Sequence, residues 1–127
     1  MFLPDILVDA CGWVAVIDAG INIDHGLINM FGKYQLLLLP SVKKELELIN
    51  QKRSSHQPLL LDLLNKKAKN VEPLDNSVKH TDKQLFLLSK HYKIPVLTVD
   101  KVLKSKLHES NLPVIQITGK NRLEYIE

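Results

Sequence analysis

Apolar residues along the chain come in short runs that alternate with longer segments of helical periodicity. Short runs of Leu, Ile and Val bounded by Pro or Asp are typical of buried strands, whereas apolar positions three and four apart predict amphipathic helices. The predicted strands are residues 6–8, 35–39, 71–74, 96–99 and 114–118. The predicted helices are two short ones within residues 12–34 that break at Gly20, then residues 41–51, 58–69, 81–92 and 101–110.

The alternation of strands and helices predicts an α/β fold with a central parallel sheet that is covered by helices on both faces. At 127 residues the chain has the length of one domain. No repeat, low-complexity segment or linker divides it, so we expect a single domain over residues 1–127.

Composition narrows the class of protein. With 45% apolar and 24% charged residues the chain is expected to form an ordinary globular core. No apolar stretch approaches the ~20 residues of a membrane span, and the N-terminal residues lack the basic region of a signal peptide. Cys11 is the only cysteine, so no intrachain disulfide can form and a cytoplasmic location is expected. The net charge of +3 is compatible with a polyanionic partner.

Four acidic residues stand where the predicted elements meet. Asp9 and Asp100 directly follow predicted strands, whereas Glu45 and Asp82 lie in the first turns of predicted helices and project onto their apolar stripes. The carboxyl ends of parallel strands meet at one edge of a sheet, where α/β proteins place their ligand crevice. We therefore expect the four carboxylates to lie together at this edge, an arrangement suited to a divalent metal.

Each acid also has an ordinary structural interpretation. Asp100 could cap the helix that follows it, Asp82 could complement a helix dipole, and Asp9 could open a turn. Glu45 is harder to explain in this way, because a carboxylate on the core side of a helix needs a partner. Thr81, with Gln84 three residues later, matches a capping box at the start of its helix.

The order of these acids resembles the acidic quartet of PIN-domain nucleases, in the segments ILVDA, LPSVKKEL, TDKQLFLLSKHYKIPVLTVD and DKVLKSKL. The resemblance covers roughly residues 6–122 and is closest to the compact archaeal PIN proteins, which are related to rRNA-processing enzymes and to toxin–antitoxin ribonucleases. It implies a Rossmann-like three-layer sandwich and metal-dependent cleavage of single-stranded RNA. The implied partners are RNA, a second copy of the chain, and an antitoxin or a ribosome-assembly protein.

Two residues depart from the pattern of the family. Cys11 stands two residues after the first acid, where many members have Asn or Ser, and Val99 precedes the last acid, where members often have Asn or Arg. Thr98 is retained, and its hydroxyl is expected to orient a carboxylate or a metal-bound water as a supporting residue.

The chemistry of the acids suits phosphodiester hydrolysis. One or two Mg²⁺ or Mn²⁺ ions would neutralise the phosphate and lower the pKa of a bound water. On this interpretation Asp9 and Asp100 bind the main ion, and Glu45 and Asp82 complete the site directly or through water. The RNA-binding candidates are Lys83, Lys101 and Lys104, for which a solvated helix face is the structural alternative.

Two other classes of protein stay open. A receiver-like α/β module would need an acceptor Asp at the end of its third strand, where Asp75 is a poor substitute. A catalytically weak PIN-like RNA-binding or assembly subunit would keep the acids without turnover. Titration with Mn²⁺ or Mg²⁺ separates a nuclease, which needs the ion, from a subunit that is indifferent to it.

Overall fold

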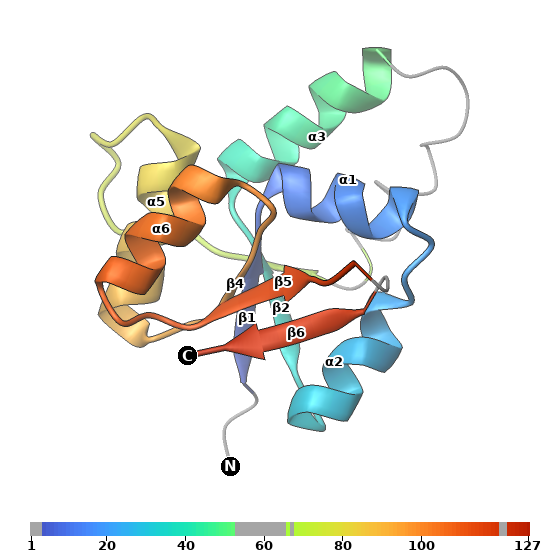
Figure 1. The fold of residues 1–127 in the computed structure, drawn as a ribbon. Coiled ribbons are helices and arrows are strands. Elements are labelled where there is room, and N and C mark those ends of the chain that lie inside the picture. Colours follow the sequence, from blue (N-terminus) through green and yellow to red (C-terminus); the bar gives the residue numbers. More distant parts are fainter. Residues whose placement is uncertain (1–3, 53–65, 67, 120–121) are drawn as a thin grey trace.

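Strands and helices alternate along the chain in the computed structural model, which describes residues 4–52, 66, 68–119 and 122–127 (Figure 1). The strands are β1 (Asp5–Val8), β2 (Gln35–Leu38), β3 (Ala68–Asn70), β4 (Val96–Leu97), β5 (Val114–Ile117) and β6 (Leu123–Ile126). The helices are α1 (Ala10–Asp18), α2 (Ile23–Phe31), α3 (Pro40–Lys52), α5 (Thr81–Tyr92) and α6 (Lys101–Glu109). Within the described residues no helix has the length and apolar character needed to cross a membrane.

The strands form one sheet in the order β3-β2-β1-β4-β5-β6. The first five are parallel to one another, with Ile6 of β1 opposite Leu36 of β2 and Leu7 opposite Val96 of β4. β6 returns antiparallel to β5 and forms an edge of the sheet. The predicted α/β fold is therefore confirmed, with one antiparallel strand added to its parallel sheet.

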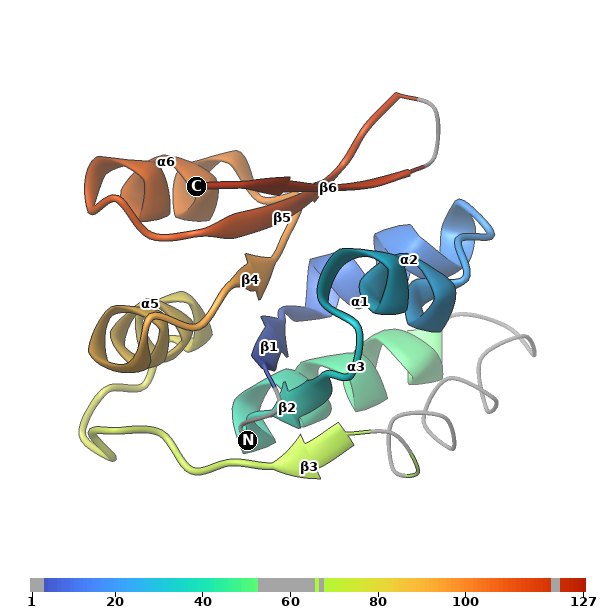
Figure 2. The ribbon, with the colours of Figure 1, turned by 90° about the horizontal axis from the view of Figure 1, so that it is seen from below.

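Helices cover both faces of this sheet. Figure 2 shows α1, α2 and α3 on one face and α5 and α6 on the other. This division follows from right-handed crossovers, because the chain moves outward from β1 to β3 and then returns to β4 and β5 in the opposite direction. The predicted three-layer arrangement is confirmed.

The core lies between the central strands and the two helical layers. Residues 6–8 of β1 and 36–38 of β2 are buried without alternation, which is typical of parallel strands covered on both faces. Trp13 from α1 is buried beside them, and Leu85 and Leu103 bury the inner faces of α5 and α6. Burial of each large apolar side chain stabilises the fold by about 1.5–3 kcal/mol.

The break between α1 and α2 lies where the sequence predicts it. Gly20 has a φ of +68°, a conformation that a glycine adopts without steric cost. Asn22 is the N-cap of α2, and its side chain accepts a hydrogen bond from the backbone N–H of His25 at 3.0 Å. The break predicted at Gly20 is therefore confirmed.

Two predicted elements differ from the structure, and one strand was not predicted. The strand predicted at 71–74 is wrong, because β3 is at Ala68–Asn70 and the chain then leaves the sheet just before Pro73, which cannot donate to a ladder. The helix predicted at 58–69 falls mostly outside the described residues and is wrong at its C-terminal end, where β3 begins. β6 was not predicted, because a short edge strand with one partly covered face has a weak apolar pattern.

Candidate active site

The middle of the sheet brings two strand ends side by side. β1 and β4 are parallel neighbours, with Val8 opposite Leu97. After β1 the chain continues to β2 on one side, and after β4 it continues to β5 on the other side. A crevice is therefore expected beyond the carboxyl ends of β1 and β4. Asp9 follows β1, and its backbone N–H donates to the carbonyl oxygen of Leu97 at 3.2 Å. Thr98 follows β4, so Asp9 and Thr98 meet at the crevice.

Asp9 is held by hydrogen bonds to both of its carboxylate oxygens. The residue is only 4% exposed. Its Oδ1 accepts from the backbone N–H of Gly12 at 2.6 Å and so caps α1. Its Oδ2 accepts from the hydroxyl of Thr98 and from the thiol of Cys11, the latter at 3.1 Å. The carboxylate therefore has a fixed orientation at the end of β1.

The protonation of Asp9 reflects competing effects. Burial raises its pKa, hydrogen bonds from Thr98, Cys11 and the N–H of Gly12 lower it, and the negative charge of Asp82 raises it. The balance leaves the pKa of Asp9 above its ordinary value. A cation beside Asp9 would offset both the buried charge and the repulsion from Asp82.

Gly12 allows α1 to approach this carboxylate. A Cβ at this position would lie 2.6 Å from the carbonyl oxygen of Leu97 and 2.8 Å from Oδ1 of Asp9. Both distances are too short for real atoms, so only glycine fits without a shift of the backbone. The need for glycine at this position was not predicted from the sequence, although a glycine three positions after an acid, inside an apolar helix, is a recognisable signal.

Cys11 and Thr98 complete the surroundings of Asp9. Burial raises the pKa of the Cys11 thiol to about 11, and the negative charge of Asp9 adds to this effect. The thiol is therefore protonated at neutral pH and donates a hydrogen bond to Asp9. Thr98 is fully buried; its hydroxyl donates to Asp9 and accepts from the backbone N–H of Asp100 at 3.1 Å.

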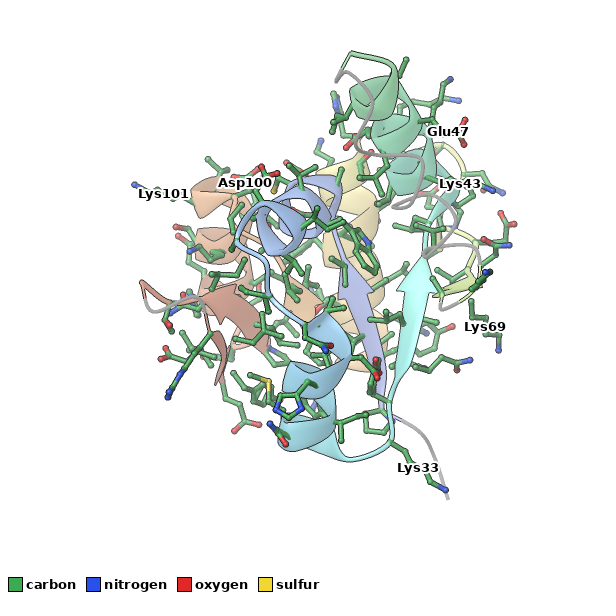
Figure 3. The ribbon with its side chains drawn as sticks, turned by 90° about the vertical axis from the view of Figure 1, so that its right-hand side faces the viewer. Lys33, Lys43, Glu47, Lys69, Asp100 and Lys101 are labelled. Atoms are coloured by element: carbon green, nitrogen blue, oxygen red, sulfur yellow. The ribbon has the colours of Figure 1, made fainter. Side chains whose placement is uncertain are left out.

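Asp100 is the N-cap of α6. Its Oδ1 accepts from the backbone N–H of Val102 at 2.9 Å and from that of Leu103 at 3.4 Å. These hydrogen bonds show that Asp100 caps its helix, which was the structural interpretation of this residue. Among the described residues, no such donor contacts its Oδ2. Asp100 lies at the same edge of the sheet as α1, with Lys101 beside it (Figure 3).

Glu45 does not lie on the core side of α3, and that expectation is wrong. Val42 and Leu46 face the core, whereas Glu45 is exposed and Leu48 is half exposed. The helix therefore presents a narrower apolar stripe than its sequence suggests. Oε1 of Glu45 accepts a hydrogen bond at 2.7 Å from the hydroxyl of Thr81, the first residue of α5.

The capping box predicted at the start of α5 is also wrong. His80 is the N-cap, and its side chain makes no capping hydrogen bond. The Gln84 side chain instead donates to the carbonyl oxygen of Val78 and accepts from the hydroxyl of Ser41, both at 2.7 Å. These bonds attach the beginning of α5 to α3 and to the loop before α5.

Asp82 is exposed in the first turn of α5, not buried on its apolar stripe as expected. Its charge nevertheless acts on Asp9, which brings the first and third acids of the predicted quartet within electrostatic reach of each other. Within the part of the chain that the structure describes, no three His, Cys, Asp or Glu side chains are close enough to hold one metal ion together.

The predicted RNA-binding lysines flank these acids. Lys83 follows Asp82 in α5 and is exposed, as is Lys101, which follows Asp100. Lys104 lies one turn further along α6 and is partly covered. The candidate site therefore combines carboxylates at the sheet edge with cationic side chains next to them in sequence.

Comparison with known proteins agrees with this architecture. A family model described as a PIN like domain matches residues 6–120. Ribonuclease VapC4 of Methanocaldococcus jannaschii is 30% identical over 108 residues, which cover 82% of this chain and 82% of that protein. The structure of the PIN domain endonuclease Utp24 is similar with a TM-score of 0.76, over 96% of this chain and 92% of that chain, at 16% identity. The likeness to Utp24 concerns the fold alone. The chain therefore belongs to the PIN-like domain family, as the order of its acidic residues predicted.

Proposed function

We propose that this protein is a metal-dependent endoribonuclease that hydrolyses phosphodiester bonds in single-stranded RNA. The observation that carries the proposal is the buried carboxylate of Asp9 between β1 and β4, where the order of the strands reverses. The Thr98 hydroxyl links this carboxylate to the backbone of Asp100, and the charge of Asp82 is within reach. The similarity to a protein named a ribonuclease, over 82% of both chains, supports the same activity.

The donor set suits Mg²⁺ or Mn²⁺. All four acids offer hard oxygen ligands, and Mg²⁺ is commonly bound by one or two carboxylates while it keeps several waters. The absence of a three-ligand group among the described residues is therefore compatible with an ion held by two carboxylates at a time. We assign the direct ligands to Asp9 and Asp100, with Asp82 and Glu45 contributing directly or through water. A bound ion would neutralise the phosphate and acidify a water.

The residues around Asp9 prepare it for this role. A carboxylate offers about four lone-pair positions, and the hydrogen bonds from Gly12, Cys11 and Thr98 occupy three. Among the residues that the structure describes, no donor takes the remaining position on Oδ1, which a cation would use. Because these donors fix the carboxylate before any ligand arrives, little reorganisation is needed on binding.

The lysines next to the acids would hold the RNA. Phosphates on either side of the bond that is cut would be attracted by Lys83, Lys101 and Lys104. We expect the protein to act in the cytoplasm, either in RNA processing or as the toxin of a toxin–antitoxin pair. Its partners would then be RNA, a second copy of the chain, and an antitoxin or ribosome-assembly protein. An antitoxin gene beside this one would favour the toxin role.

The test is cleavage of a labelled single-stranded RNA with Mn²⁺ or Mg²⁺. We expect cleavage that excess EDTA stops and that Asp9→Asn or Asp100→Asn abolishes. Glu47→Gln is the matched control, because Glu47 is an exposed acid that points away from the site on α3 (Figure 3). RNA binding without cleavage at any metal concentration would instead favour the assembly subunit, and cleavage that persists in EDTA would contradict the proposal.

A further inference from the structure

A groove runs between α5 and α6 on the face of the sheet opposite α1 and has a volume of about 400 Å³. These two helices pack against each other, and Figure 1 shows them together at the left of the molecule. The groove is lined by Val78, Asp82, Lys83, Phe86, Leu87, Lys106, Glu109 and Ser110. Its size falls in the range of roughly 300–1,000 Å³ that is typical of small-ligand pockets.

The lining divides into an apolar floor and a charged rim. Val78, Phe86 and Leu87 are partly buried and supply the floor. Lys83 and Lys106 are exposed and supply positive charge at the rim. An aromatic ring beside cationic side chains is the combination that holds a nucleotide in single-strand-binding proteins, since the ring stacks on the base and the cations bind the phosphate.

The groove shares one residue, Asp82, with the candidate active site. Asp82 lines the groove, and its charge also acts on Asp9 at the end of β1. A strand whose phosphodiester lies at these carboxylates therefore has a neighbouring nucleotide within reach of the groove. Glu109, on the rim, would repel a phosphate, so the phosphate belongs beside the lysines and the hydrogen-bond donors of the base or ribose beside Glu109.

We infer that this groove is a subsite for one nucleotide of the RNA strand, next to the bond that is cut, with its base against Phe86. The inference rests on the proposed function, because the occupant is the RNA that the acids would cleave. It predicts that the protein binds one particular base of its substrate by stacking, independently of the metal.

The test is a set of short single-stranded RNAs in which one nucleotide at a time lacks its base. Their affinity for the protein is measured by fluorescence anisotropy in EDTA, so that metal-dependent cleavage does not consume the probe. We expect one abasic position to weaken binding by roughly 5- to 150-fold, the effect of one lost base–aromatic stack. In Phe86→Leu, which keeps an apolar floor but lacks the ring, the intact RNA should bind as weakly as that abasic RNA.

Tyr92→Leu is the matched control, because Tyr92 is an exposed aromatic residue at the far end of the same helix and outside the groove. It should keep the full difference between the intact and abasic RNAs. Melting curves show whether each of the two variants is folded. If Phe86→Leu does not fold, Leu87→Ala is used instead to change the floor of the groove.

Two results would overturn the subsite: no single abasic position weakens binding to the wild type, or the abasic effect is unchanged in Phe86→Leu. If the wild type nevertheless cleaves RNA and depends on Asp9, only the subsite fails. If no metal-dependent cleavage occurs at all, the proposed function fails, and with it the assignment of the occupant.

Discussion

Asp9 combines a structural and a chemical task in one side chain. Its Oδ1 caps α1, and its Oδ2 receives the hydroxyl of Thr98 and the thiol of Cys11. The side chain of a helix cap at the surface is usually solvated, but Asp9 is 96% buried between β1, β4 and α1. The same geometry that stabilises the start of α1 therefore leaves a costly negative charge in the interior.

The raised pKa of Asp9 gives the metal-free protein a defined pH dependence. The folded state holds this proton more tightly than the unfolded state, so the contribution of Asp9 to stability is complete below the ordinary pKa of aspartate and is lost as pH rises through the folded value. In EDTA, Asp9→Asn should remove this loss from the curve of unfolding free energy against pH, measured in urea.

Asp75→Asn is the control for this experiment. Hydrogen bonds from Ser77 lower the pKa of the exposed Asp75, so its contribution has the opposite sign, being lost as pH falls. The Asp75→Asn variant should still show the loss of unfolding free energy that Asp9 causes at higher pH. A wild-type curve that matches Asp9→Asn across this range would show that Asp9 does not titrate as described.

Thr98 is predicted to position Asp9 without touching the substrate. Thr98→Val keeps the branched shape but removes the hydroxyl, which leaves the Cys11 thiol as the remaining described donor to Oδ2 of Asp9 and leaves the N–H of Asp100 without this acceptor. We expect kcat/KM for RNA and the affinity for Mn²⁺ in the absence of RNA to fall by about 10- to 100-fold. Thr98→Ser should restore both, and equal losses in the two variants would argue against the hydroxyl.

Gly12 and Gly26 form a natural pair for testing close contacts. A Cβ at Gly12 would strike the backbone carbonyl of Leu97 at 2.6 Å, whereas one at Gly26 would meet the flexible end of the Leu123 side chain at 2.8 Å. Gly12→Ala should therefore lower the unfolding free energy by about 1–3 kcal/mol, despite the better helix propensity of alanine.

Gly26→Ala should change the unfolding free energy less, because Leu123 can rotate away. Both values come from urea denaturation. A Gly12→Ala protein as stable as the wild type would mean that α1 moves away from β4 easily.

At the scale of elements, the start of α5 is attached to α3 by two hydrogen bonds, one from Thr81 to Glu45 and one from Ser41 to Gln84. These bonds hold the first turn of α5, and with it Asp82, at the same edge as Asp9. Helix α5 also packs against α6. The position of the third acid thus depends on contacts between elements that are far apart in the sequence.

Asp82→Asn tests whether this acid belongs to a metal site. Removing the charge of Asp82 relieves its repulsion of Asp9. The same change removes a negative charge from the N-terminal turn of α5, where such a charge stabilises a helix by about 0.3–1 kcal/mol. These effects oppose each other, so we expect the melting temperature in EDTA to be unchanged or higher, by the equivalent of at most ~1 kcal/mol.

The increase in melting temperature that Mn²⁺ causes is the decisive measurement, because an ion that binds only the folded state stabilises it. This increase should be smaller in Asp82→Asn than in the wild type, whereas Glu47→Gln should match the wild type. Equal increases in Asp82→Asn and the wild type would remove Asp82 from the site.

At the scale of the whole molecule, the modest charge of +3 matters through its distribution. Lys101 lies beside Asp100 at one edge of the sheet, whereas Lys33 and Lys69 lie well away from it (Figure 3). Positive side chains beside the carboxylates would guide a polyanion toward the acids without neutralising them.

Lys101→Ala combined with Lys104→Ala should therefore weaken RNA binding and flatten its salt dependence. For a single strand, each lost phosphate contact reduces the slope of log affinity against log salt concentration by about 0.7, so two contacts give about 1.4. Lys33→Ala combined with Lys69→Ala is the matched control and should leave the slope unchanged. An unchanged slope in the first variant would place the RNA elsewhere on the surface.

Elements with strong local patterns could be predicted from the amino-acid sequence without the structure. The short apolar runs of β1 and β2, bounded by Asp or Pro, are typical of buried strands. The break at Gly20 is a local backbone preference. Asp100, between a strand and an amphipathic helix, predicts both a cap and a place at the crevice. The order of the acids was sufficient to predict the family.

The contacts of the side chains around the acids, in contrast, depend on which elements pack together. Glu45 and Leu48 look equally suited to the core on a helical wheel, but the partners of α3 cover only the side of Val42 and Leu46. The need for glycine at position 12 comes from the carbonyl oxygen of Leu97, some 85 residues away, and β6 exists because β5 offers it an edge. Burial and close approach depend on which elements meet, and no local pattern of residues records that.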